Sequence, residues 1–361
     1  MHDEQLLQQR LINQHLVNPR YSSVSKLVNY LGAVQAQDFA MSKWAIGLRT
    51  INSTQEKVEA AINKGSILRT HILRPTWHLV SAEDIYWMLE LSAQKIKAIM
   101  RSNEKKLGID EPLFKKTNRI LEKALSEHEQ LNRDEIIQLF NKHKIIINEN
   151  RLAHFLMHAE LEAIICSGKI IGNKNTYALL AKRVTKKNTT KREEALYMLA
   201  KKYFQSRGPA AIADFAWWSG LSINDATKAL HAVESTLHKE TINNREYYFK
   251  SSNNYTGEIS TVFVLPAFDE YLISYKHRSH MLHSIKKNIS VNGIFWPVIL
   301  ANGKVAGMWS RRMVNNKLTV QTEYFSKLST AIKNDLMKSF NAYAKFLHKQ
   351  VIVNRSMKGN L

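Results

Sequence analysis

The sequence predicts a mainly helical fold with short β-hairpins, in which three tandem winged-helix units are followed by a C-terminal α+β segment. Three observations support this α+β class. Amphipathic helical patterns recur along the chain, each group of helices ends in an extended stretch with a turn signal, and this combination occurs three times. The chain has 361 residues, enough to bury two or three modest cores.

The first predicted unit covers residues 1–105. Its apolar residues recur at the spacing of a buried helix face in three stretches, 4–17, 23–31 and 54–64. Residues 67–80 follow as a pair of extended arms, because they carry apolar runs typical of strands. We therefore expect three helices and a hairpin, the winged-helix order, in this unit.

The second unit, residues 106–188, and the third unit, residues 189–252, repeat this order. The predicted helices are 111–127, 133–144 and 148–165 in the second unit and 192–205, 210–219 and 223–234 in the third. The hairpins turn at residues 173–175 and at Asn243-Asn244, since asparagine tolerates the left-handed backbone of tight turns. Trp217 and Trp218 end an apolar helix and are expected to fill the third core.

The C-terminal segment, residues 253–361, follows a linker at 251–254 that is rich in serine and asparagine. Strand-like stretches cover residues 260–264 and 294–309, and a helix is expected at 328–345. Asn302-Gly303 marks a hairpin turn within the second stretch. Lys304 stands beside this turn, so we expect it to reach a DNA groove.

The charge of the chain indicates a polyanionic partner. With 52 Lys and Arg against 31 Asp and Glu, the formal net charge is +21, which favours nucleic acid. No apolar run approaches the roughly 18 residues of a membrane-spanning helix. The N-terminus lacks the basic and apolar regions of a signal peptide. We therefore expect a cytoplasmic, nucleoid-associated protein with no membrane contact.

A cationic linker joins the second and third units. Residues 182–192 include Lys186 and Lys187 among other basic residues. Binding of this linker to phosphates and simple solvation of its charges explain the composition equally well.

The segment Val34-Gln35-Ala36-Gln37-Asp38 is the most informative part of the sequence. Residues two apart in an extended backbone share a face, so Gln35 and Gln37 would point into one space. Composition alone favours a plainer interpretation, in which two loop glutamines are only solvated. Asp38 would serve either as a carboxylate base or as the cap of the next helix, and we expect the cap.

Several fragments, in the same order along the chain, resemble the winged-helix DNA glycosylases of the AlkZ/YcaQ (AlkX) type. They read VQAQD at 34–38, LRPTWH at 73–78, MHAEL at 157–161, TYALL at 176–180, GPA at 208–210 with DFAWWSGL at 214–221, and LPAFDE at 265–270. One fragment would carry little weight. Together they span nearly the whole chain, and that combination is specific.

This resemblance implies both an architecture and an activity. The family has three tandem winged helices in a C-shaped molecule that encircles DNA. Its catalytic pair is a glutamine followed, after an apolar residue, by glutamine or aspartate. Gln35 and Gln37 match the glutamine-glutamine branch and depart from the YcaQ branch, which has aspartate. The breadth of crosslink unhooking is therefore not carried over.

The chemistry of an amide narrows the expected substrate. Cleavage of an N-glycosidic bond needs a water placed on the anomeric carbon of an oxocarbenium-like sugar. A glutamine can orient that water but cannot take its proton as a true base. The leaving group must therefore be good already, as in cationic N7-alkylguanine or N3-alkyladenine. Bulky adducts and crosslinks at the same ring positions are a further option. We expect a monofunctional, metal-independent glycosylase without cofactor, acting as a monomer on duplex DNA containing alkylated purines.

Basic and aromatic residues near the glutamines are candidate DNA contacts. In the first extended pair they are Arg69, His71, Arg74, Trp77 and His78, and in the C-terminal segment they are Lys276, Arg278 and Lys304. Arginine and lysine would hold phosphates. For Trp77, stacking on DNA and packing in the local core remain equal alternatives.

Other candidate sites are weaker. His154 and His158 have the i, i+4 spacing of a metal pair, but no third ligand of obvious spacing except Glu162 follows, and packing is the favoured role. The single cysteine, Cys166, excludes an intramolecular disulfide and a cysteine-rich zinc site, and its apolar neighbours indicate burial. Two rival functions are also compatible with the positive net charge. They are a winged-helix transcriptional regulator, and an RNA-binding or architectural protein, which leaves the paired glutamines unexplained.

Overall fold

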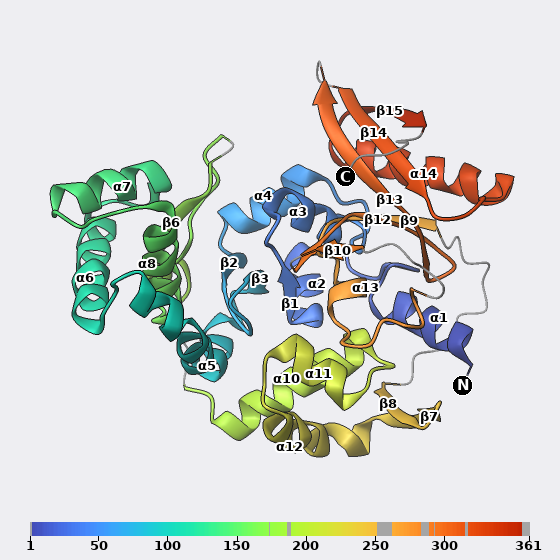
Figure 1. The fold of residues 1–361 in the computed structure, drawn as a ribbon, viewed down its shortest axis with the longest axis horizontal. Helices are drawn as coiled ribbons and strands as arrows, with labels where there is room; N and C mark the ends of the chain where they lie inside the picture. The colour runs from blue at the N-terminus through green and yellow to red at the C-terminus, as the bar shows by residue number, and fades with distance from the viewer. Residues whose placement is uncertain are drawn as a thin grey trace.

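The computed structural model describes residues 2–172, 174–185, 189–250, 262–282, 289–291, 293–314 and 317–355 (Figure 1). Lys186 and Lys187 and the expected linker at 251–254 lie outside these ranges. None of the described helices is both long and apolar enough to cross a membrane.

The first unit contains the expected helices, including the one that Asp38 was expected to cap, and the expected hairpin, together with one more short strand. After α1 (Asp3–Asn13) come α2 (Val24–Leu31), β1 (Ala33–Gln35), α3 (Phe39–Gly47), α4 (Gln55–Asn63), β2 (Ile67–His71) and β3 (Trp77–Ser81). The strands form an antiparallel sheet in the order β1-β3-β2. Ser23, Asp38 and Thr54 start three of the helices, because each side chain accepts a backbone N–H of the first turn.

The second unit repeats this order of elements after a long connecting helix, α5 (Ile85–Lys106), which the helical patterns of the sequence had not indicated. Its elements are α6 (Glu111–Glu127), β4 (Leu131–Asn132), α7 (Arg133–Lys142), α8 (Glu149–Leu161), β5 (Ile165–Ser167) and β6 (Thr176–Leu179), followed by α9 (Leu180–Arg183). The sheet order is β4-β6-β5. α8 ends before the predicted residue 165, since Ala163 adopts a left-handed backbone with φ of 57° and the chain turns into β5.

The third unit has the same order, with a single bridge in place of the first strand. Its elements are α10 (Arg192–Arg207), α11 (Ile212–Ser219), α12 (Ile223–Val233), the short 3-10 helix Glu234–Thr236, β7 (His238–Ile242) and β8 (Arg245–Phe249). Ala210 forms the antiparallel bridge to Tyr248. The predicted turn is confirmed, because Asn243 and Asn244 both adopt left-handed backbones with φ of 50° and 58°.

The C-terminal segment contributes a curled five-stranded sheet. Its elements are β9 (Val262–Leu265), α13 (Glu270–Ile273), β10 (Ser290–Val291), β11 (Ile294–Phe295), β12 (Val298–Ala301), β13 (Lys304–Val314), β14 (Lys317–Tyr324), α14 (Thr330–Phe346) and β15 (Gln350–Arg355). The sheet order is β15-β14-β13-β12-β9, with only the β14–β15 pair parallel. The sequence had indicated most of β9, then β11, β12, the start of β13 and α14, but not β14 or β15.

The apolar cores divide the chain unevenly. The second unit has a core of its own, which includes Phe114, Phe140 and Phe155. The other units share their cores, since one cluster joins α1 to the third unit and to α13, and another joins the first unit to the C-terminal sheet. Figure 1 shows the result, with the first unit in the middle, the second to one side, the third below and the C-terminal sheet above.

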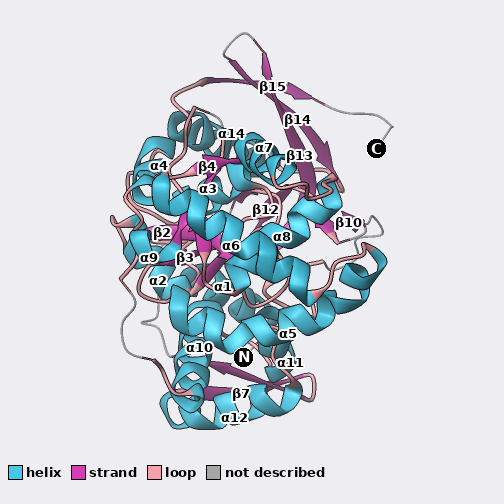
Figure 2. Cartoon of the chain, turned by 90° about the vertical axis from the view of Figure 1, so that its left-hand side faces the viewer, coloured by secondary structure: helices cyan, strands magenta, loops and turns pink. Residues whose placement is uncertain are grey.

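The view from the side confirms this arrangement. In Figure 2 the helices α6 and α8 of the second unit lie toward the viewer, with β13, β14 and β15 at the top and α12 and β7 at the bottom. The third unit and the C-terminal sheet therefore lie at opposite ends of the molecule. The first unit lies between them and carries the glutamine segment.

Candidate functional site

Gln35 lies at the end of β1, where the first unit contacts α13. Its Cα is paired with that of His78 in β3, and its backbone N–H donates to Glu270 Oε1 at 2.8 Å. The side-chain Oε1 accepts a long bond of 3.4 Å from Arg74 Nη2. Gln35 is buried, with 7% of its surface exposed. Glu270 holds its backbone, and Arg74 holds its side-chain amide.

Glu270 and Arg207 form a buried ion pair next to Gln35. Glu270 Oε2 accepts from Arg207 Nη2 at 2.7 Å, from Ser274 Oγ at 2.7 Å and from Trp218 Nε1 at 3.1 Å. Burial alone would raise the pKa of Glu270, but Arg207 and the surrounding donors lower it to about 2. The carboxylate therefore stays charged and ties β1 to the third unit and to α13.

Arg69 holds the peptide between the two glutamines. The Ala36 carbonyl accepts from Arg69 Nε at 3.1 Å and from Nη2 at 2.9 Å, and the Ala36 N–H donates to the Trp77 carbonyl at 2.7 Å. The guanidinium carbon lies 4.2 Å from the ring centre of Trp77 and 5.3 Å from that of Phe39. Arg69 is thus half-buried and fixes the path of the loop.

Gln37 and Asp38 complete the loop with different environments. Gln37 is exposed and Gln35 retains 7% exposure, and β1 ends at Gln35, so the extended strand from which a shared face was expected does not reach Gln37. The Asp38 side chain accepts from the Met41 N–H at 3.0 Å. The expectation that Asp38 caps the next helix is confirmed, and the cap fixes where α3 begins.

Two further guanidinium groups belong to Arg74, which contacts Gln35, and to Arg278, whose charge interacts with that of Arg74. Burial lowers the pKa of Arg74, against the attraction of Glu270. Burial also lowers the pKa of Arg278 to about 10, and this time Asp214 opposes the change and Arg74 adds to it. Both groups remain charged at neutral pH. Within the described part of the chain, the buried atoms Arg74 Nε and Arg278 Nη2 have no hydrogen-bond acceptor.

The sequence and the fold both match known proteins. The family of AlkZ-like DNA glycosylases matches residues 28–346. The chain belongs to this family. The interstrand DNA cross-link repair glycosylase of Streptomyces sahachiroi is 24% identical over 334 residues, which cover 86% of this chain and 88% of that protein. The solved structure of Streptomyces sahachiroi DNA glycosylase AlkZ has the same fold, with a TM-score of 0.78 at 21% identity over 98% of this chain and 99% of that one.

Two histidines of this AlkZ-like chain are buried, which corrects their expected place at a DNA surface. His71 donates its N–H to Glu160 Oε2 at 3.0 Å, and its ring nitrogen contacts the same oxygen. His78 is fully buried against the Thr76 carbonyl, and burial lowers its pKa to about 3. The neighbouring units cover both rings. Trp77 packs between His71 and Arg69, which favours the core role over stacking on DNA.

The lysines expected to contact DNA have varied positions in the AlkZ-like fold. Lys276 is exposed. Lys304 is half-buried beside a turn that packs on α1, because a Cβ on Gly303 would lie 2.8 Å from Leu7 Cβ. Tyr271 also donates to the Gly303 carbonyl at 3.0 Å. Contact of Lys304 with a DNA groove therefore stays a prediction.

The remaining candidate residues have packing roles. The His158 ring stacks on Phe114 with centroids 3.9 Å apart, and His154 Nδ1 lies 3.7 Å from Glu104, which is the packed role that the sequence favoured. Cys166 is buried as expected, and burial raises the pKa of its thiol to about 12. Trp218 lies in the core as predicted. Trp217 does not, since it is 42% exposed.

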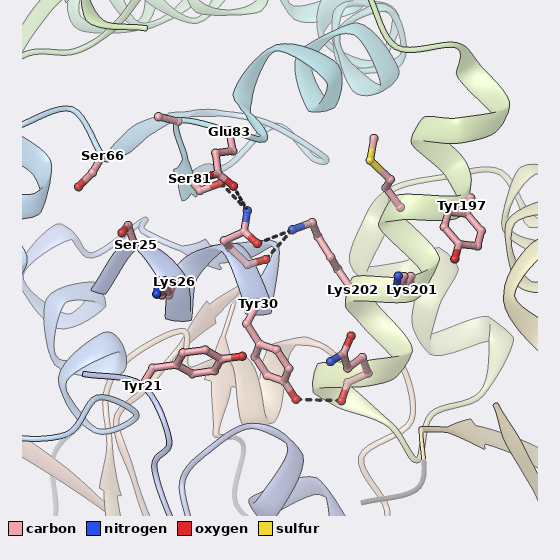
Figure 3. A pocket seen from close by; sticks show the side chains of 14 residues that line it. Tyr21, Ser25, Lys26, Tyr30, Ser66, Ser81, Glu83, Tyr197, Lys201 and Lys202 are labelled. Carbon is pink, nitrogen blue, oxygen red and sulfur yellow. Dashed lines mark hydrogen bonds between the residues drawn. The ribbon is translucent and has the colours of Figure 1, made fainter. Parts of the chain in front are cut away.

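A surface hollow of the AlkZ-like chain lies between α2 and α10. It has a volume of about 680 Å³, and Lys202, which Figure 3 shows beside it, donates to the carbonyl and the side-chain oxygen of Asn29. Lys202 also pairs with Asp84 at 3.0 Å, and Tyr30 donates to the Gln205 carbonyl. These polar groups bond one another across the junction of the first and third units, so the hollow reflects the packing of two units.

The sequence interpretation missed the buried groups that hold the loop. Glu270 and Trp218 appear in it only as parts of fragments or of a core, Arg207 does not appear in it, and none was a candidate site residue. The fragment LPAFDE at 265–270 was the available signal. Its acidic residues follow an apolar strand, but their partners lie 63 and 235 residues away.

Proposed function

We propose that the chain is a monofunctional DNA glycosylase that hydrolyses the N-glycosidic bond of cationic alkylated purines in duplex DNA, with Gln35 and Gln37 positioning the water. The observation that supports this most directly is the fixed loop from Gln35 to Asp38. Glu270, Arg69 and the Asp38 cap restrain its backbone at successive residues, while the Gln37 amide stays exposed. Such preorganisation is what placing a water requires.

The proposed reaction needs no acid or base of matched pKa. The water oxygen bonds to the anomeric carbon as the bond from that carbon to the purine nitrogen breaks. The purine keeps the electron pair of that bond, which cancels its positive charge, and the proton of the water passes to solvent. An amide oxygen accepts a hydrogen bond from the water and orients it, without taking the proton. Neutral bases such as uracil would need an acid and should not be released.

Backbone phosphates of the DNA are the proposed ligands of the Arg74 and Arg278 guanidinium groups. Arg74 Nε and Arg278 Nη2 have no protein acceptor in the described residues, and a guanidinium matches the geometry of a phosphate. We add Lys276 and, outside the described residues, Lys186 and Lys187. The three repeated units, each with the order of a winged helix, would form the curved scaffold for the duplex. Because the units are unequal, no dimer is required.

The proposed substrates share one leaving-group chemistry. N7-alkylguanine and N3-alkyladenine carry a positive charge, and so do guanines whose N7 bears a bulky adduct or one arm of a crosslink. The Streptomyces sahachiroi relative is called an interstrand DNA cross-link repair glycosylase, which supports including crosslinks in the proposed range.

Release of 7-methylguanine from a duplex tests the proposal. Gln35→Ala and Gln37→Ala should each lower the single-turnover rate about a hundredfold, the usual loss for a positioned catalytic contact. Gln8→Ala, which removes an exposed glutamine of α1, is the matched control and should behave as the wild type. Release at the wild-type rate by both loop variants would refute the role of the pair. No release by the wild type, with tight binding to one DNA sequence, would favour a transcriptional regulator.

The salt dependence of binding tests the DNA surface separately. The affinity for undamaged duplex should fall steeply as salt rises, because Lys and Arg displace counterions from phosphates. Replacing Lys186 and Lys187 by alanine should weaken binding to all sequences alike and reduce that slope. A slope near zero for the wild type would exclude a phosphate-based interface.

A further inference from the structure

An aromatic cavity lies where the glutamine loop meets the C-terminal sheet. Its volume is about 360 Å³, and its walls come from the start of α3, the turn before α13, the β11 region and strands β13 and β14. Asp38 and Met41 line one side, and Phe268, Phe295 and Trp296 supply aromatic surface. A cavity of this size with mostly apolar walls and a few polar groups is typical of a site for a small planar ligand.

Phe268 is held in the cavity wall in a strained conformation. Its φ is 57°, a left-handed backbone that bulky residues rarely adopt. The two residues that follow are fixed by buried charge, since Asp269 pairs with Arg49 at 2.7 Å and Glu270 binds Arg207 and the Gln35 N–H. Local strain of this kind persists only where the surroundings over-determine it and is concentrated at functional sites. The buried Glu270 carboxylate therefore holds the glutamine loop and also the chain next to the cavity wall.

Phe295, a second aromatic residue of the cavity wall, lies beside the guanidinium group of Arg278. The Phe295 ring lies 6.5 Å from that of Phe268 at an interplanar angle of 58°, and the Arg278 guanidinium lies 4.8 Å from the Phe295 ring centre. Arg278 Nη2 has no hydrogen-bond acceptor among the described residues. A phosphate on Arg278 would therefore bring its nucleotide to the edge of the cavity, and Ile294, 47% exposed, forms part of the rim.

We propose that this cavity binds the alkylated purine after it leaves the base stack, with the ring against Phe268, Phe295 and Trp296. Two acidic residues, Asp38 and Glu323, and one basic residue, Arg311, line the cavity, so its acidic residues outnumber its basic one, which complements the charge of a cationic base. This inference rests on the proposed glycosylase function and adds to it the place where the base lies. Extrusion of a target base into a protein pocket is one way in which enzymes reach an atom that the duplex conceals.

Two variants test the cavity without removing residues of the glutamine loop. Trp296→Ala removes aromatic surface, and Ile294→Trp fills the cavity from its exposed rim. Both should lower single-turnover release of 7-methylguanine about tenfold to a hundredfold, the range for loss of one base-stacking contact. Their affinity for undamaged duplex and their thermal midpoints should stay at wild-type values. Tyr197→Ala is the matched control, since Tyr197 is a half-buried aromatic residue lining the other hollow (Figure 3).

Inhibition by free base supplies a second readout that does not depend on catalysis by a variant. Free 3-methyladenine should inhibit the wild type competitively and should inhibit Trp296→Ala at least about threefold less strongly. Release at the wild-type rate by both cavity variants, or no inhibition of the wild type by free base, would overturn the assignment. Since wild-type release is measured in the same assay, failure of the cavity and failure of the glycosylase proposal give different results.

Discussion

The hairpins of the first and third units occupy the same place in their units but have different surroundings. The first hairpin, β2–β3, is enclosed by other units. Its His71 binds Glu160 of α8, its Arg69 N–H donates to Ser167 of β5, and its turn packs on Gly220 after α11. The third hairpin, β7–β8, ends in the asparagine turn, and its pair of Lys239 with Glu246 is exposed to solvent.

This difference shows how a common unit becomes the support of a site. Gln35 belongs to β1, and β1 is hydrogen-bonded to β3 of the enclosed hairpin. Restraint by two neighbouring units therefore passes directly to the glutamine loop. The third hairpin supports no such strand, since its counterpart is a single bridge at Ala210, and its tip remains at the surface. If this interpretation is correct, damage to the first hairpin should cost far more than damage to the third.

The largest effect is expected for Gly220→Ala. Gly220 has a left-handed backbone, and a Cβ there would lie 2.2 Å from the Leu73 carbonyl oxygen. Backbone strain and overpacking together should lower the free energy of unfolding by roughly 2–5 kcal/mol. Gly172→Ala is the control, because Gly172 has a similar φ of 57° with nothing within 4 Å of the added Cβ, and strain alone costs about 1 kcal/mol. Equal urea midpoints for the two variants would contradict the enclosure of the first hairpin.

The next largest effect is expected for acidification, which should lower the free energy of unfolding through groups in the enclosed region. Glu270 has an ordinary pKa of 4.5 and a folded value of about 2, so its contribution is present above pH 4.5 and is lost as the pH falls toward 2. At about 1.4 kcal/mol per tenfold change in proton affinity, this is roughly 3 kcal/mol. His78 acts in the same direction, because only the unfolded chain binds its proton between pH 6.5 and about 3.

Urea unfolding at a series of pH values measures this loss. The wild-type free energy of unfolding should fall as the pH decreases below 6.5, and Glu270→Gln should be less stable at neutral pH but lose less below pH 4.5. Parallel curves for the two proteins would show that Glu270 is not the acid-sensitive group.

A smaller effect is expected when one carboxylate on each hairpin is neutralised. Glu160→Gln removes a buried acceptor of two contacts from His71 and should lower the free energy of unfolding by roughly 1–3 kcal/mol. The first hairpin would loosen, so the rate of 7-methylguanine release should also fall. Glu246→Gln, which changes an exposed pair of the third hairpin, should leave both unchanged. A larger effect at Glu246 than at Glu160 would reverse the comparison.

The smallest effect is expected at the tip of the third hairpin. Asn243 has φ of 50°, which glycine adopts without strain, so Asn243→Gly should change the free energy of unfolding by about 0.5 kcal/mol or less. Thermal unfolding and release of 7-methylguanine would both be measured. A marked loss of release with unchanged stability would mean that this tip contacts the substrate and that the third hairpin is part of the site.

Local signals in the sequence predicted many of the elements. The expected helix at 111–127 has the bounds of α6, the Asn243-Asn244 turn is in place, and Asp38 caps α3. Such features depend on residues within a few positions of each other. The prediction of Trp217 as a core residue was wrong because it also rested on a local pattern, the apolar helix that the two tryptophans end. Helical spacing puts two adjacent tryptophans on different faces, and only Trp218 meets the core.

By itself, the sequence determined the kinds of element, their repeated order, the polyanionic partner implied by a charge of +21 and, by resemblance, the family that the comparison confirms. Only the tertiary structure decided which polar residues are enclosed. The first and third hairpins have similar local patterns, yet His71 and His78 are buried because α8 and the third unit pack over their hairpin. Glu270 meets Gln35 and Arg207 from distant parts of the chain. Burial and charge pairing depend on contacts between units, and periodicity within one unit carries no information about them.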